Sequence, residues 1–245
     1  MSVCRSIFFL MLAALVSMPA QAAWPPEFRA TYQLHKLGMN AAEVRSSLET
    51  KADGSMLYKS KTETKGLVSM FRSDKITEKT VLEKSGSQWR PLSYRYIHKG
   101  SKKNRNRSVD FDYANNRANC ISRGKPSEHT LQKDMHDGFS LQLKLMHDLH
   151  EGKTDLDYQV IYKGKIKRYR FENMGNETIE TNAGTYNTVK LKRSREGGKR
   201  TTYMWVASQL HFLPVRIKHV EKDGTEFSLE LEKIAGAITG KQANK

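Results

Sequence analysis

Hydrophobic and polar residues alternate along most of this chain. Apolar or aromatic residues occupy every second position in the segments 92–98, 109–113, 156–162, 213–219 and 227–231. A period of two is typical of β-strands that have one buried and one solvated face. Turn signals such as Asp53-Gly54, Lys163-Gly164 and Asp223-Gly224 separate these segments. The pattern predicts a long antiparallel meander, which has to curl or close to cover its apolar face.

One segment departs from this alternation and predicts a helix. After Asp137-Gly138, the residues Phe139, Leu143 and Met146 recur at helical spacing, with a second row of leucines beside them. Asp137 can cap the helix N-terminus, and Gly152 can occupy the position after its C-terminus. We expect a mainly β fold, with one strongly curved antiparallel sheet or open barrel and one principal α-helix on its concave face.

The N-terminus carries the features of a secretory signal peptide. Residues 1–22 combine Arg5, an apolar run over 7–16 and the small residues Ala20 and Ala22 around Gln21. No later segment approaches the roughly 20 apolar residues that a membrane-spanning helix needs. We therefore predict a signal peptide over 1–22, one β-rich domain over 23–234 and a disordered tail over 235–245. The mature chain is expected to be periplasmic, with no transmembrane segment.

Four motifs follow one another along the mature chain. They are Pro91-Leu92-Ser93-Tyr94-Arg95-Tyr96, Asp137-Gly138-Phe139-Ser140 before the leucine-rich helix, Asn176-Glu177-Thr178-Ile179 followed by Ala183-Gly184-Thr185-Tyr186, and Tyr203-Met204-Trp205-Val206 followed by Leu213-Pro214-Val215-Arg216-Ile217. In this order they resemble the Gram-negative envelope proteins known as domain of unknown function 3108. The resemblance implies an envelope location and a curved β fold similar to the open barrels of periplasmic lipoprotein carriers. It implies no particular activity.

Positive charge dominates the sequence, with 42 basic against 26 acidic residues and a formal net charge of +16. Two clusters surround predicted hairpin turns and are our candidates for an anion-binding rim: Lys99, Lys102, Lys103, Arg105, Arg107, Lys165, Lys167 and Arg168. Outside the cytoplasm the available polyanions are lipid head groups, lipopolysaccharide phosphates and acidic glycans, so we do not expect nucleic acid as a partner. The alternative is a set of solvated loop tips that repel one another.

Aromatic and long apolar residues on the inward-facing positions could form a wall for an apolar ligand. The candidates are Tyr94, Tyr96, Phe111, Tyr158, Tyr162, Trp205, Leu143 and Met146. An ordinary β core would use the same residues. Met70 and Phe71, in an apolar segment between strand patterns, are candidates for a lid.

Signals for catalysis are weak. His147 and His150 have a spacing that could share a metal, but His-Glu-x-x-His and Gly-x-Ser-x-Gly are both absent. Cys120, the only cysteine after residue 22, is expected to be buried rather than reactive. We predict no catalytic residues, no metal and no cofactor.

These features favour a non-enzymatic periplasmic protein that binds an amphipathic, anionic envelope component, such as a lipid, a lipopolysaccharide part or an acyl chain. The first alternative is a cationic scaffold that docks an acidic glycan or protein. The second is a histidine-based metallohydrolase. Peripheral contact with a membrane and the oligomeric state stay open.

Overall fold

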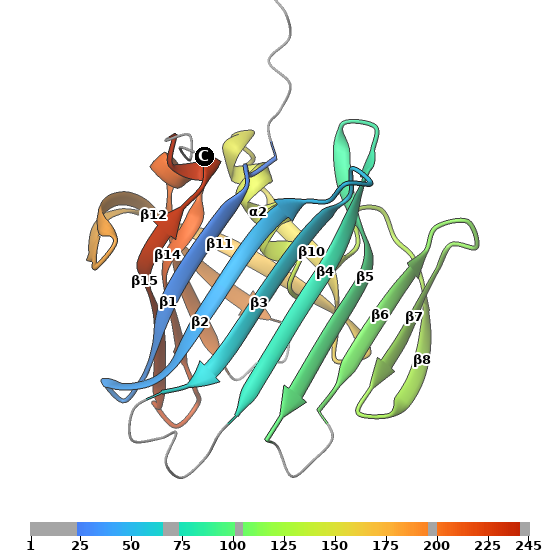
Figure 1. Cartoon of the computed structure of the whole chain (residues 1–245), viewed down its shortest axis with the longest axis horizontal. Helices are drawn as coiled ribbons and strands as arrows, with labels where there is room; N and C mark the ends of the chain where they lie inside the picture. The colour runs from blue at the N-terminus through green and yellow to red at the C-terminus, as the bar shows by residue number, and fades with distance from the viewer. Residues whose placement is uncertain (1–23, 66–73, 101–104, 196–199, 241–245) are drawn as a thin grey trace, which may run out of the picture.

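A computed structural model describes residues 24–65, 74–100, 105–195 and 200–240 of this chain (Figure 1). The predicted signal peptide, the lid candidates Met70 and Phe71, and the rim candidates Lys102 and Lys103 lie outside the described residues.

The described residues form one sheet of fifteen strands. Its first half consists of β1 (Phe28–Lys36), β2 (Met39–Thr50), β3 (Met56–Thr64), β4 (Lys75–Ser85), β5 (Gln88–Lys99), β6 (Arg107–Asp112), β7 (Arg117–Ser122) and β8 (Lys125–Thr130). The second half consists of β9 (His136–Asp137), β10 (Leu156–Tyr162), β11 (Lys165–Thr181), β12 (Gly184–Arg195), β13 (Thr201–Ala207), β14 (Leu213–Val220) and β15 (Glu226–Ala235). The helix α2 (Leu141–His150) and two short 3₁₀ turns, η1 (Ser208–Leu210) and η2 (Ala237–Thr239), complete the structure.

The strands follow the order β8-β7-β6-β5-β4-β3-β2-β1-β15-β14-β13-β12-β11-β10-β9 across the sheet. Neighbours are antiparallel except for β9 and β10, which are parallel. Each half is therefore a meander, and the two halves join where β1 pairs with β15. The sheet curls around α2, which lies near its upper end in Figure 1. This confirms the predicted curved, mainly β fold with a helix on the concave face.

The helix begins one turn later than Asp137 would suggest. Its N-cap residue is Ser140, whose side chain makes no capping hydrogen bond. Asp137 belongs to β9, and its Oδ1 accepts hydrogen bonds from the backbone N–H groups of Phe139 and Ser140, at 2.8 and 2.9 Å. Asp137 thus stabilises the turn before the helix instead of capping it. At the other end Gly152 has a φ of +73°, as expected for the glycine that follows a helix C-terminus.

The ordered chain continues past residue 234. Ala235 ends β15, and η2 then places Ile238 in the hydrophobic core. The backbone N–H of Ile238 donates to the carbonyl of Glu27 at 3.2 Å. At Gly236 a Cβ atom would lie 2.7 Å from that same carbonyl oxygen, so only glycine allows this close approach. Residues 235–240 therefore differ from the predicted disordered tail.

Candidate functional site

The concave face of the sheet is tightly packed near the helix and more open at its far end. In β1, Phe28 and Tyr32 are buried against Leu143 and Met146 of α2, whereas Leu34, on the same side of the strand, is half-exposed. Burial also decreases from Tyr58 to Thr62 in β3 and from Leu48 to Val44 in β2, although Ala42, the next inward-facing residue of β2, is buried again. Several inward-facing side chains farther from the helix are therefore less buried than those beside it.

The more open half is lined by inward-facing residues that remain half-exposed. They are Leu34, Val44, Thr62, Ile76, Tyr96, Ile217 and Leu229, which we call the open row. The sheet register places Val44 opposite Thr62, Thr62 opposite Ile76, and Leu34 opposite Leu229. Val44 and Leu229 pack against the first of three core clusters, Ile217 against the second and Tyr96 against the third, so each contributes only part of its side chain to the concave surface.

The predicted aromatic wall is divided among three core clusters. Leu143, Met146 and Trp205 belong to the first cluster, and Tyr158 belongs to the second. Tyr94 and Phe111 belong to the third, where they are buried. Tyr96 and Tyr162 alone among the eight are half-exposed. Trp205 lies on the opposite face of β13 from Met204, which packs with Leu191 in the second cluster, and its Nε1 donates to Glu177 Oε2 at 2.6 Å. Alternation alone could not separate this outer-face position from the inner ones, nor the buried part of a strand from its half-buried part.

A seam forms where β8 meets the turn between β10 and β11. The hydroxyl of Ser127 donates to the carbonyl oxygen of Gly164 at 3.1 Å, and Nε2 of His129 lies 3.0 Å from that oxygen. Behind these contacts, Ile161 of β10 packs in the cluster formed by residues of β5, β6 and β7. The curled sheet is therefore closed here by side-chain contacts and not by a strand ladder.

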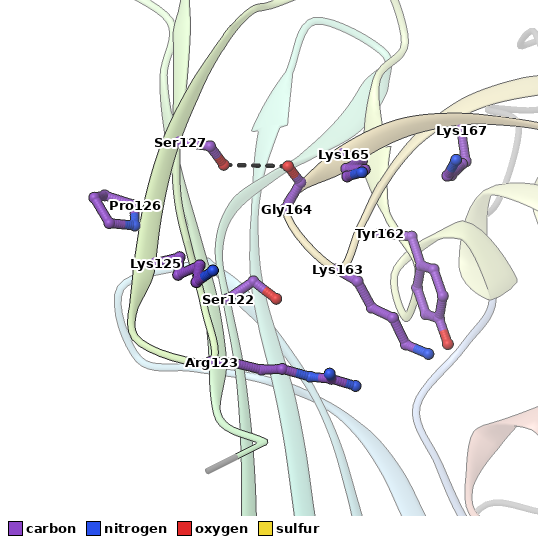
Figure 2. Close-up of a pocket in the computed structure, with 10 residues that line it drawn as sticks. All are labelled: Ser122, Arg123, Lys125, Pro126, Ser127, Tyr162, Lys163, Gly164, Lys165 and Lys167. Atoms are coloured by element: carbon purple, nitrogen blue, oxygen red, sulfur yellow. Dashed lines mark hydrogen bonds between the residues drawn. The ribbon is translucent and has the colours of Figure 1, made fainter. Parts of the chain in front are cut away.

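A hollow of about 610 Å³ opens at this seam, and we call it the seam pocket. Five basic residues line it: Arg123, Lys125, Lys163, Lys165 and Lys167 (Figure 2). Ser122, Ser127 and Tyr162 add hydroxyl groups, and no acidic residue is among the lining residues. None of the five cations forms an ion pair with another residue that the structure describes.

The cationic character continues from the seam pocket toward the open row. The guanidinium of Arg107 lies 4.1 Å from the ring centroid of Tyr96 and 5.9 Å from that of Tyr162. Nε of Arg107 is buried and has no hydrogen-bond partner among the described residues. Lys163 Nζ lies 4.9 Å from the Tyr162 ring centroid. Tyr162 and Arg107 thus connect the seam pocket to Tyr96 of the open row.

The structure gathers only part of the predicted basic rim. Lys165 and Lys167 lie in the seam pocket, and Arg107 lies beside it. Lys99 ends β5, and Arg105 is exposed in the approach to β6. Arg168 lies on the other face of β11 from Lys167, where it forms an ion pair with Asp157.

Three further cations of the pocket, Arg123, Lys125 and Lys163, were not among our candidates. The dipeptides Arg123-Gly124 and Lys163-Gly164 carry the signal that could have identified two of them. Each joins a basic residue to a tight-turn glycine. Their proximity arises from the closure of the sheet, which the local sequence does not encode.

A buried group of serine, histidine and aspartate lies between β9 and α2. Ser140 Oγ donates to Asp137 Oδ2 at 2.7 Å and lies 3.1 Å from His136 Nδ1. In a catalytic triad the histidine bridges the serine and the carboxylate, whereas here the serine is the bridge. Burial lowers the pKa of His136 to about 3, so its ring stays neutral. Thr80 of β4 also donates to Asp137, at 3.2 Å. The group therefore ties β4, β9 and α2 together and has no activated nucleophile.

Most of the other chemically reactive side chains are engaged in packing. His147 is buried and stacks on Trp24, with ring centroids 5.2 Å apart. His150 is exposed, and its ring centroid lies 5.2 Å from that of His211. Within the described ranges, no three histidine, cysteine or acidic side chains gather as a metal site. Burial raises the pKa of the Cys120 thiol to about 11. The described helices include none with the length and apolar character to cross a membrane.

Comparison with known proteins supports the fold. The family model described as protein of unknown function, DUF3108, matches residues 27–232. The structure is similar to the crystal structure of a beta-barrel-like protein of the domain of unknown function DUF1849 from Brucella abortus, with a TM-score of 0.58 and 6% identity over 87% of this chain and 99% of that chain. It is also similar to the crystal structure of MucB, with a TM-score of 0.37 and 9% identity over 92% of this chain and 57% of that chain. No curated protein sequence matches this chain.

Proposed function

The chain belongs to the DUF3108 family of proteins of unknown function, and from this starting point we propose that it is a non-enzymatic periplasmic protein that binds an amphipathic, anionic component of the cell envelope. The ligand class comprises lipids, lipopolysaccharide parts and acyl chains. The open row would hold the apolar part of the ligand, and the cations at the seam would face its charged part.

The observation that carries this proposal is the incomplete burial of inward-facing residues in β1, β2 and β3 beyond the helix. Leu34 and Val44 face the interior beyond the helix and keep contact with solvent. Each methylene group of an acyl chain buried against such residues contributes about 0.8 kcal/mol. Eight methylene groups would thus contribute about 6 kcal/mol before the entropic cost of binding.

The charge distribution supports an anionic rather than a neutral ligand. Arg107 lies between the rings of Tyr96 and Tyr162, at the junction of the open row and the seam pocket. The five cations of the seam pocket continue this positive surface. A net charge of +16 would also attract anionic lipid surfaces over long distances at low ionic strength.

Lysophosphatidylglycerol is a suitable probe, because it combines one acyl chain with a phosphate and stays soluble at low concentration. Titration followed by native mass spectrometry should show a 1:1 complex with the wild-type protein. Ile76→Asp places a charge in the open row and should weaken binding at least tenfold. Thr77→Asp is the matched control, since Thr77 is the neighbouring outward-facing residue of β4 and its variant should bind like the wild type.

Equal binding by the two variants would contradict the location of the acyl site. Absence of any complex with the wild-type protein, together with salt-dependent binding of acidic polysaccharide, would favour the scaffold function. Export is tested separately by the intact mass of the protein from a periplasmic extract, which should correspond to a chain that begins at Ala23.

A further inference from the structure

We propose that the seam pocket is a phosphate-binding site and that a phosphate group bound there holds the two sides of the seam together. The inference rests on the function proposed above in one respect, because the same pocket would receive the head group of a phospholipid-like ligand. It goes further in assigning the anion class and in making closure of the sheet depend on the anion.

The pocket is built from two turns that carry the same charge. The β7–β8 turn supplies Arg123 and Lys125, and the β10–β11 turn supplies Lys163 and Lys165. The two turns are in close contact, because a Cβ atom on Gly164 would lie 3.1 Å from Cβ of Ser122. Figure 2 shows Arg123 and Lys163 extending toward the same side of the pocket, where Tyr162 lies. Like charges this close repel one another, so the free protein opposes its own closure.

Backbone conformation gives a second, independent observation. Arg123 has a φ of +56° and Lys163 a φ of +55°, and each precedes a glycine that also has a positive φ. Asparagine, aspartate or glycine is favoured at this position of a tight hairpin turn. A long basic side chain therefore occupies a strained position in both turns of the seam. Leu37 and Gly38 in the β1–β2 turn have the same conformation, so what distinguishes the seam is that a basic side chain occupies this position in both of its turns.

The chemistry of the pocket matches a phosphate group. Arg123 can donate two parallel hydrogen bonds to phosphate oxygens, and the lysines add point charges. Ser122 and Tyr162 offer hydroxyl donors in the same lining. With no carboxylate in the lining, nothing there repels an anion. An anion that contacts both turns would cancel their repulsion and add a bridge to the two contacts that Gly164 makes with Ser127 and His129.

Inorganic pyrophosphate is the probe for this site, because it has no acyl chain. Isothermal titration calorimetry at low salt should show one site in the wild-type protein. Arg123→Asn and Lys163→Asn should each weaken binding at least tenfold. Asparagine suits the left-handed backbone of both positions, so these variants should fold. Lys84→Asn is the control for net charge, since Lys84 is exposed on β4, outside the pocket, and its variant should bind like the wild type.

Thermal unfolding separates binding from general stability. Pyrophosphate should raise the Tm of the wild-type protein and of Lys84→Asn, but not that of Arg123→Asn or Lys163→Asn. Without the anion, the two pocket variants should be at least as stable as the wild type, because each loses repulsion and backbone strain. Equal pyrophosphate binding by all three variants, or none by the wild type, would overturn the proposal.

Lysophosphatidylglycerol distinguishes failure of this site from failure of the proposed function. If Arg123→Asn and Lys163→Asn affect neither lysolipid binding nor pyrophosphate binding, the phosphate site is overturned and the acyl site is left intact. Pyrophosphate binding without lysolipid binding would support the phosphate site, as one for free phosphates, and contradict the proposed lipid ligand.

Discussion

The helix contains a buried ion pair whose carboxylate also accepts a hydrogen bond from the sheet, and removal of this carboxylate should be severe. Lys144 and Asp148 lie one turn apart on α2, and their side chains are only 5% and 3% exposed. Asp148 Oδ1 accepts hydrogen bonds from Nζ of Lys144 at 2.8 Å and of Lys153 at 2.5 Å, and its Oδ2 accepts one from the hydroxyl of Tyr158 in β10 at 3.0 Å. Burial raises the pKa of Asp148, but the hydrogen bonds from the two lysines outweigh it and leave this pKa below its usual value.

The variant Asp148→Ala removes the partner of Lys144 and leaves a buried ammonium group. Breaking a buried pair in this way costs about 3–5 kcal/mol. A domain of this size loses about 2–4 °C in Tm for each kcal/mol, so the expected decrease is about 6–20 °C. Lys153 adds little to this loss, because its side chain is half-exposed and can return to water.

Urea denaturation of a double-mutant cycle tests this explanation. Adding Lys144→Met to Asp148→Ala should restore at least half of the lost free energy of unfolding, because no unpaired charge then stays buried. Glu49→Ala breaks an ion pair with Lys59 that is largely exposed, and it should cost less than about 1 kcal/mol. A loss below 1 kcal/mol for Asp148→Ala, or no recovery in the double variant, would refute the reasoning.

Three further predictions concern pH, the seam and the thiol. Burial lowers the pKa of His136 to about 3 and that of His219 to about 4, and both are below the unfolded value of about 6.5. The free energy of unfolding should therefore be highest above pH 6.5 and decrease as the pH falls toward 4. At pH 5 each histidine lowers this free energy by about 2 kcal/mol. Urea midpoints of the His219→Asn variant, compared with those of the wild type, check this loss. Gly164→Ala should cost about 1–3 kcal/mol in urea denaturation, because Gly164 has a φ of +71° and its Cβ would lie 3.1 Å from that of Ser122; an unchanged midpoint would argue against a tight seam. Cys120 is buried and its thiol pKa is raised, so native protein should react with a thiol reagent at neutral pH far more slowly than unfolded protein, and equal rates would contradict its burial.

The sequence predicts the local part of this fold well. Alternation depends on which face of a strand is buried, so residues such as Tyr94 and Phe111 could be assigned to the interior from their spacing alone. The helix could be predicted because Leu143 and Met146 follow the helical period and not the alternation of a strand. Gly152 predicted where the helix ends. These signals act over a few residues, which is why a single sequence contains them.

The non-local part could not be derived in this way. Alternation is the same in the packed and the open half of a strand, so it could not show that Leu34 stays half-exposed while Tyr32 is buried. Nothing near Arg123 in the sequence indicates that Lys163 will lie across the seam from it. The order of Ile238 depends on its contact with the residues that precede β1. Each of these features depends on how far the sheet curls.

The pairing of β1 with β15 has a consequence for when this protein can fold. Every other antiparallel pair of the sheet joins strands that are neighbours in sequence. The pair of β1 and β15, in which Tyr32 lies opposite Leu231, joins the first and last strands. A chain still being synthesised can build the meander from β1 to β8, yet one edge of β1 stays unpaired until β15 has been made. Ordering such a long loop before its contacts form is slow. During that interval the exposed edge can pair with other chains, so a chaperone that covers the edge of β1 would reduce aggregation.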